Sequence, residues 1–129
     1  MKQTLLAIDD VSSILTVIST IFSNDFNIVK KSNGREGLAW LYEGNIPDII
    51  ITDLQMPELT GMEFIRELKS SGLLCRIPIV VLSGKNNSAE RVMCFKLGAD
   101  EYLGKPFNPE ELHFRTKKLL ERSSSISFS

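Results

Sequence analysis

Strand-like and helix-like patterns alternate five times along this chain of 129 residues. Continuous apolar runs, at residues 5–8, 49–51 and 79–82, have the length of strands that are covered on both faces. Between the runs lie segments whose apolar residues recur every three or four positions, which is the period of a helix with one buried face. This alternation predicts an α/β fold with a mostly parallel sheet.

The expected elements follow from these two periods and from the turn residues between them. The expected strands cover about residues 5–8, 26–31, 49–52, 79–82 and 101–103. The expected helices cover about residues 12–24, 34–42, 61–69, 88–97 and 109–122. Residues 123–129 are serine-rich, and we expect them to be a flexible tail or the stub of a linker. The predicted organisation is one domain over residues 1–122, followed by this tail over residues 123–129.

Composition excludes several classes of function. The net charge of −1 argues against direct nucleic-acid binding through bulk charge. The first apolar stretch is too short for a signal peptide, and no segment has the length of a membrane span. Cys75 and Cys94 lie far apart in segments expected to be ordered, so two reduced thiols are predicted. Together these features predict a cytoplasmic protein with no membrane contact.

Five polar residues come directly after apolar runs or close behind them. They are Asp9, Asp10, Asp53, Ser83 and Lys105. Ligands of an open α/β sheet bind beyond the carboxyl ends of its strands, so we expect these side chains to converge there. Three carboxylates at one place repel each other, and a divalent cation with hard oxygen ligands relieves that repulsion. The pattern therefore predicts a Mg²⁺ site.

A carboxylate with a cation on one side and an ammonium on the other is suited to attack a phosphoryl group. Asp53 is the predicted nucleophile, because it follows the run at 49–51 and is flanked by turn residues that expose it. Ser83 is predicted to donate its hydroxyl to a phosphoryl oxygen, and Lys105 is predicted to supply positive charge.

Four segments in this order resemble the receiver domains of two-component response regulators, including the chemotaxis-type regulators. The segments are Leu6–Asp10, Ile51–Glu63, Val80–Gly84 and Gly98–Phe107. The resemblance covers residues from about 3 to 122, and the ordered set is far more specific than any one segment. It implies a flavodoxin-like (βα)5 three-layer sandwich with a five-stranded parallel sheet of order 2-1-3-4-5.

The resemblance also implies a role for each acidic residue. Asp53 is then the phosphoacceptor, which receives the phosphoryl group from a phosphohistidine. Asp9, Asp10 and Asp53 hold Mg²⁺ together with the backbone carbonyl of Gln55. On this basis the chain is no enzyme in the ordinary sense, because it catalyses only its own phosphorylation and dephosphorylation.

A second set of residues is implied to contact or sense the phosphoryl group. Ser83 and Lys105 contact it, and the peptide bond before Pro106 is cis. Tyr102 occupies the position of the family's switching aromatic residue. Phosphorylation then draws Ser83 toward the new oxygens, Tyr102 turns inward, and the surface formed by the fourth helix, fifth strand and fifth helix changes shape.

The implied partners lie on both sides of this switch. A sensor histidine kinase or a phosphotransfer protein supplies the phosphoryl group. The output passes to a downstream effector protein, to a missing output domain, or through a phosphorylation-dependent homodimer.

Two other functions compete with this interpretation. Aspartyl-nucleophile phosphohydrolases also combine an aspartate with Mg²⁺, but their signature needs an acid where this chain has Gln55. A receiver-like interaction module that accepts no phosphate is the other alternative. The complete set of three aspartates, Ser83 and Lys105 argues against it, because such a module has no need of the acids.

Overall fold

The computed structural model describes the backbone of residues 2–127 and the side chains of residues 2–123. Within residues 2–127, five strands and five α-helices alternate, and a short 3-10 helix, Leu74–Arg76, precedes the fourth strand. The strands are β1 (Gln3–Ile8), β2 (Phe26–Lys31), β3 (Ile49–Asp53), β4 (Ile79–Ser83) and β5 (Glu101–Gly104). The helices are α1 (Ser12–Phe22), α2 (Gly34–Tyr42), α3 (Gly61–Lys69), α4 (Ser88–Leu97) and α5 (Pro109–Ser127).

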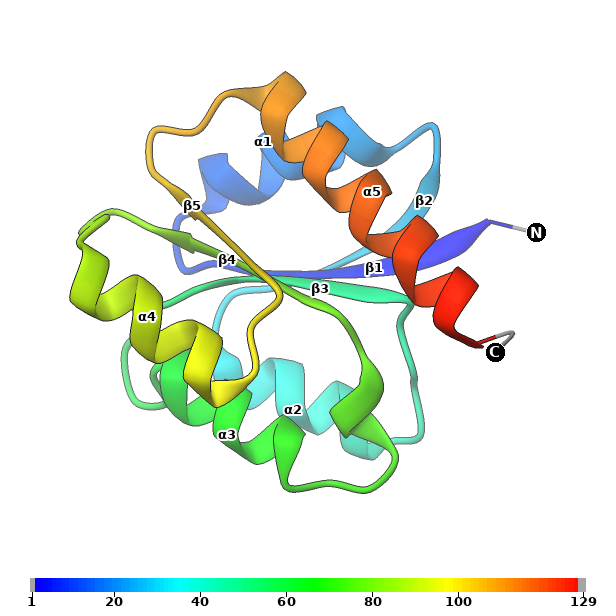
Figure 1. The fold of residues 1–129 in the computed structure, drawn as a ribbon, viewed down its shortest axis with the longest axis horizontal. Coiled ribbons are helices and arrows are strands. Elements are labelled where there is room, and N and C mark those ends of the chain that lie inside the picture. The colour runs from blue at the N-terminus through cyan, green and yellow to red at the C-terminus, as the bar shows by residue number, and fades with distance from the viewer. Residues whose placement is uncertain (1, 128–129) are drawn as a thin grey trace.

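The strands form one parallel sheet in the order β2-β1-β3-β4-β5, which confirms the predicted flavodoxin-like fold. Helices α1 and α5 cover one face of the sheet, and α2, α3 and α4 cover the other (Figure 1). Strand β3 lies at the centre, between β1 and β4. Its carboxyl end therefore has a neighbouring strand end on each side.

Two hydrophobic cores lie on opposite faces of this sheet. Alternate residues of a strand point to opposite faces, so Leu5 and Ala7 belong to the core beneath α1 and α5. Leu6 and Ile8 belong to the core shared with α2, α3 and α4. Ile49–Ile51 are fully buried, as expected for a central strand that is covered on both faces.

Helix α5 corrects one sequence-based prediction. We expected this helix to end at about residue 122, but its backbone continues to Ser127. Residues 123–127 contain no glycine or proline, and extending an existing helix costs far less than starting one. Residues 128 and 129 lie outside the described residues, and the division of the chain at residue 122 stays a prediction.

Two smaller predictions concern cysteines and membranes. Cys75 and Cys94 are both free thiols, as predicted, and Cys94 is buried. Within residues 2–127, no helix combines the length and the apolar character that a membrane crossing requires.

Candidate functional site

The parallel sheet brings four strand ends to one edge of the molecule. Asp9 follows the last residue of β1, and Asp53 is the last residue of β3. Ser83 ends β4, and its register partner on β5 is Gly104, which Lys105 follows. The backbone N–H of Lys105 donates to the carbonyl of Ser83 at 2.8 Å, so these two strand ends are tied together. The convergence predicted from the sequence is therefore present.

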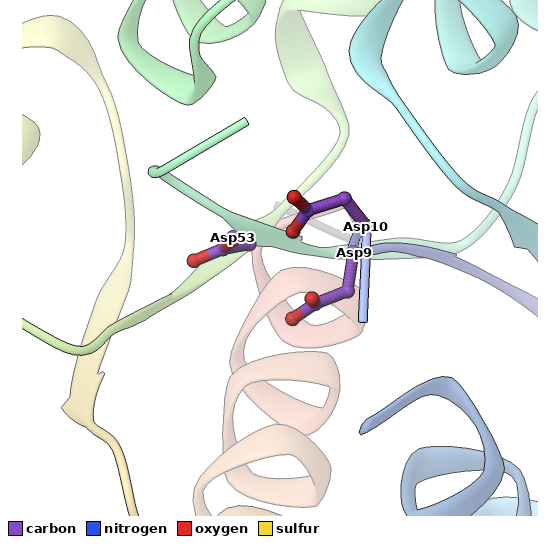
Figure 2. Close-up of side chains that lie close together, drawn as sticks. All are labelled: Asp9, Asp10 and Asp53. Carbon is purple, nitrogen blue, oxygen red and sulfur yellow. The ribbon is translucent and has the colours of Figure 1, made fainter. Parts of the chain in front are cut away.

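Three carboxylates gather at this edge (Figure 2). Asp9, Asp10 and Asp53 each offer an oxygen within 4.8 Å of the others. Asp9 and Asp53 are almost completely buried, whereas Asp10 is exposed. Asp9 is held in place by the backbone N–H of Val11, which donates to its Oδ1 at 2.9 Å. Such an arrangement concentrates negative charge where little water reaches it.

The ammonium of Lys105 lies between two of these acids. Its Nζ is 2.8 Å from Oδ2 of Asp9 and 3.2 Å from Oδ1 of Asp53. Burial alone would lower the pKa of Lys105, but its hydrogen bond to Asp9 and the charges of Asp9 and Asp53 outweigh burial and raise it. The lysine is therefore held as a cation beside the candidate nucleophile.

The carboxyl group of Asp53 experiences opposing influences. Burial raises its pKa, the charge of Asp9 raises it further, and Lys105 offsets only part of the rise. Its Oδ1 also accepts a hydrogen bond from the backbone N–H of Leu54 at 2.9 Å. Lys105 thus offsets only part of the cost of ionising Asp53, and an added positive charge would stabilise the ionised carboxylate.

Residues of the β3–α3 connection fit closely behind Asp53. A Cβ atom at Gly61, the first residue of α3, would lie 2.4 Å from the carbonyl oxygen of Asp53. Only glycine allows this approach without displacing the backbone that carries the candidate nucleophile.

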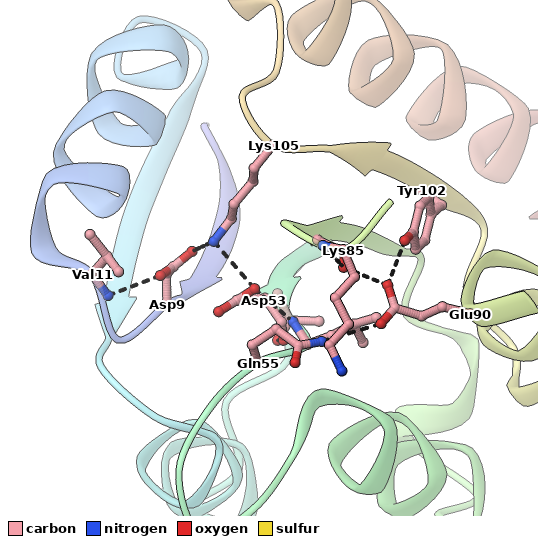
Figure 3. Close-up of polar contacts among 11 residues, drawn as sticks. Asp9, Val11, Asp53, Gln55, Lys85, Glu90, Tyr102 and Lys105 are labelled. Atoms are coloured by element: carbon pink, nitrogen blue, oxygen red, sulfur yellow. Dashed lines mark hydrogen bonds and ion pairs between the residues drawn. The ribbon is translucent and has the colours of Figure 1, made fainter. Parts of the chain in front are cut away.

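The hydroxyl of Ser83 belongs to a second network, which Figure 3 shows beside the lysine contacts. It donates to Oε1 of Glu90 on α4, and the hydroxyl of Tyr102 donates to the same oxygen. The side-chain amide of Gln55 donates to the other oxygen, Oε2, at 3.2 Å. One carboxylate therefore joins three residues that sequence analysis had placed in the site.

This network also includes Tyr102, the predicted switching aromatic residue. The side chain of Tyr102 is buried, with 8% of the residue exposed. The acceptor on Glu90 gives the phenolic hydroxyl a partner in the buried position, which explains why the ring is stable there. The response of Tyr102 to phosphorylation stays a prediction.

Sequence analysis did not identify Glu90. It is the third residue of α4, where a glutamate ordinarily indicates a helix cap. Its position seven residues after Ser83 carries no signal of its own in the sequence. The peptide bond between Lys105 and Pro106 is cis.

The donor set at this edge suits a magnesium ion. All three side chains offer carboxylate oxygens, which are the ligands that Mg²⁺ prefers, and exposed Asp10 leaves room for the waters that this ion keeps. The incompletely compensated charge of Asp53 is a second reason for a cation to bind here.

Comparisons with known proteins agree with one another. A family model described as the response regulator receiver domain matches residues 5–117. The Bacillus subtilis alkaline phosphatase synthesis transcriptional regulatory protein PhoP is 34% identical over 95% of this chain and 50% of its own length. Response regulator SaeR of Staphylococcus epidermidis is 35% identical over 97% of this chain and 53% of its own length. The chain thus spans about half the length of these relatives, and it spans 9% of a histidine kinase from Formosa agariphila.

Solved structures show the same likeness. A response regulator receiver domain protein from Clostridium thermocellum superposes with a TM-score of 0.86 at 31% identity, covering 96% of this chain and 98% of its own. The chemotaxis response regulator CheY4 of Vibrio cholerae superposes with a TM-score of 0.82 at 29% identity, covering 93% of this chain and 99% of its own.

Proposed function

This chain belongs to the response regulator receiver domain family of two-component signalling, and we propose that it accepts a phosphoryl group on Asp53. The observation that carries the proposal is the place of this carboxylate. It is buried at the end of the central strand, 3.2 Å from the ammonium of Lys105 and beside two further acids. A merely structural aspartate would have no need of that acidic surrounding.

The proposed reaction is a transfer between an imidazole nitrogen and a carboxylate oxygen. A carboxylate oxygen of Asp53 attacks phosphorus and forms an O–P bond, while the N–P bond of the donor phosphohistidine breaks. The electron pair of that bond returns to the imidazole. Lys105 keeps its proton and stabilises the negative phosphoryl oxygens, a role that its raised pKa supports.

Asp9, Asp10 and Asp53 would hold Mg²⁺, and we propose that the backbone carbonyl of Gln55 adds a further ligand. Bound there, the cation would supply positive charge that offsets the negative charge of these carboxylates and of an incoming phosphoryl group. Lys105 now bridges Asp9 and Asp53, so its contacts must adjust when the phosphoryl group arrives.

We further propose that the signal leaves through the face formed by α4, β5 and α5. Ser83 would exchange its present acceptor for a phosphoryl oxygen, and the contact of Glu90 with Tyr102 would pass that change to α4 and β5. The face carries exposed apolar side chains such as Phe95 and Phe114, which suit contact with a protein.

The partners are proposals of the same kind. A sensor histidine kinase or phosphotransfer protein would supply the phosphoryl group. An effector protein, an attached output domain or a second copy of the chain would receive the signal, and an attached domain is favoured by relatives about twice as long. A cytoplasmic location stays a prediction.

The intact mass of the protein tests the proposed reaction. The chain is incubated with Mg²⁺ and acetyl phosphate, in parallel with the Asp53→Asn variant and with a magnesium-free control. We expect one added phosphoryl group on the wild-type chain only. An equal mass increase in Asp53→Asn would overturn the assignment of the nucleophile.

A further inference from the structure

Glutamate occupies the third position of α2, α3, α4 and α5, and its carboxylate contacts the cap residue in α2 and α3. In α5 the carboxylate of Glu111 instead accepts a hydrogen bond from Arg115. In α2, Oε2 of Glu36 accepts a hydrogen bond from the side chain of the cap residue Asn33 at 3.1 Å. In α3, Oε1 of Glu63 accepts from the backbone N–H of the cap residue Thr60 at 2.9 Å. In α4 the backbone N–H of Glu90 is capped in the usual way, but its carboxylate points to the phosphorylation site. Its role is therefore more than that of a capping residue.

The carboxylate of Glu90 accepts hydrogen bonds from three residues of the candidate site. The hydroxyls of Ser83 and Tyr102 both donate to Oε1, and hydrogen bonds to an ionised carboxylate are stronger than those to a neutral acceptor. The amide of Gln55 donates to Oε2. Glu90 thus joins the β3–α3 connection, the end of β4 and β5 to α4.

A serine hydroxyl has one hydrogen to donate. In this structure Ser83 gives that hydrogen to Glu90, while its Oγ accepts from the backbone N–H of Lys85 at 3.2 Å. Ser83 is fully buried, so water is not available as a substitute partner. A phosphoryl oxygen and the carboxylate of Glu90 are therefore competing acceptors of the same hydrogen.

We propose that Glu90 is a positioning residue that competes with the phosphoryl group for the Ser83 hydroxyl. This competition weakens binding of the phosphoryl group. The inference rests on the function proposed above. The negative charge of Glu90 acts in the same direction, because it repels phosphoryl oxygens. The same carboxylate holds Tyr102, so release of Ser83 changes the hydrogen bonding of the switching aromatic residue as well.

Glu90 also acts on the pKa values of its neighbours. Burial raises the pKa of Tyr102, and the hydrogen bond to Glu90 raises it further. Burial also raises the pKa of Cys94, one turn along α4, to about 11, with a smaller contribution from the charge of Glu90.

Calorimetric titration with fluoroberyllate, a mimic of the phosphoryl group, in the presence of Mg²⁺ measures the competition. The proteins are the wild-type chain, Glu90→Gln, Glu90→Ala, and Glu67→Gln as a control that removes an exposed carboxylate on α3. Affinity should rise about tenfold in Glu90→Ala, as expected for the release of one hydrogen bond to a charged group. Glu90→Gln should lie between, because its amide oxygen still accepts but carries no charge, and Glu67→Gln should match the wild type.

A second readout detects the contact without any phosphoryl mimic. In a Tyr42→Phe background Tyr102 is the only tyrosine, so absorbance at alkaline pH reports its ionisation alone. Removing Glu90 should lower the pKa of Tyr102, whereas Glu67→Gln should leave it unchanged.

The outcomes separate this inference from the function on which it rests. If the wild-type chain bound the mimic and the Glu90 variants bound it no more tightly, the competition would be refuted while the proposed function stood. If the wild-type chain bound no mimic, the proposed function would fail and the inference with it. An unchanged pKa of Tyr102 would refute the contact itself.

Discussion

Replacing Gly61 by alanine should destabilise the fold at the point where the candidate site is built. The new Cβ would lie 2.4 Å from the carbonyl oxygen of Asp53 and 2.6 Å from Cα of Leu54, whereas ordinary van der Waals contact begins at 3.4 Å. Both obstructing atoms belong to the backbone and cannot rotate away. Crowding of this kind costs about 1–3 kcal/mol of unfolding free energy.

A gain in helix propensity offsets part of that cost. Alanine is favoured over glycine by up to about 1 kcal/mol in a helix interior, but Gly61 is the first residue of α3, where the gain is smaller. Because the clash is with main-chain atoms, we place the net loss near 2 kcal/mol, which corresponds to a fall in melting temperature of about 5–10 °C.

Urea unfolding followed by circular dichroism measures the change. Gly72→Ala is the matched control, since a Cβ there meets no atom within 4 Å, and this variant should be unchanged or slightly more stable. The rate of phosphorylation by acetyl phosphate should also fall in Gly61→Ala, because the backbone of Asp53 must shift. If Gly61→Ala were as stable as Gly72→Ala, the close approach behind Asp53 would not exist in solution.

Three further substitutions test the electrostatics and packing. Burial and the charge of Asp9 raise the pKa of Asp53 above its unfolded value, so the free energy of unfolding of the wild type falls as pH rises from about 4 through the folded-state pKa. Asp53→Asn carries no such group, so its stability relative to the wild type should increase over that range in urea unfolding. A difference that stays constant with pH would contradict this. Lys105→Ala leaves two buried carboxylates facing each other and should lose about 3 kcal/mol in magnesium-free buffer; an unchanged urea midpoint would count against the ion pairs. The buried hydroxyl of Thr116 has no hydrogen-bond partner within residues 2–123, so Thr116→Val should raise the unfolding free energy by about 1 kcal/mol, and a loss would reveal a missed partner.

Local patterns were sufficient to predict the elements but not their order in the sheet. The apolar run at 49–51 and the spacing within Gly61–Lys69 identify a buried strand and an amphipathic helix directly. Strand order depends on which way each crossover turns, and it came from the resemblance to receiver domains. Helix α5 extends to Ser127 because serine only mildly disfavours a helix that has already formed. The serine-rich composition of this segment had suggested that the helix ends earlier.

The candidate site shows a similar division. Asp9, Asp53 and Lys105 were recognisable because each comes just after a strand, and parallel strands end at the same edge. Glu90 was not recognisable, because the same helix position in α3 holds Glu63, whose carboxylate is a true cap. Only the direction of the side chain distinguishes these two residues, and that direction is a tertiary property.

Locating the phosphoryl group on the chain tests the central claim most directly. After incubation with Mg²⁺ and acetyl phosphate, borohydride reduces an aspartyl phosphate to homoserine, and peptide mass mapping then identifies the altered residue. We predict homoserine at position 53 and at no other aspartate. Homoserine at Asp9 or Asp10 with Asp53 unaltered would contradict the account.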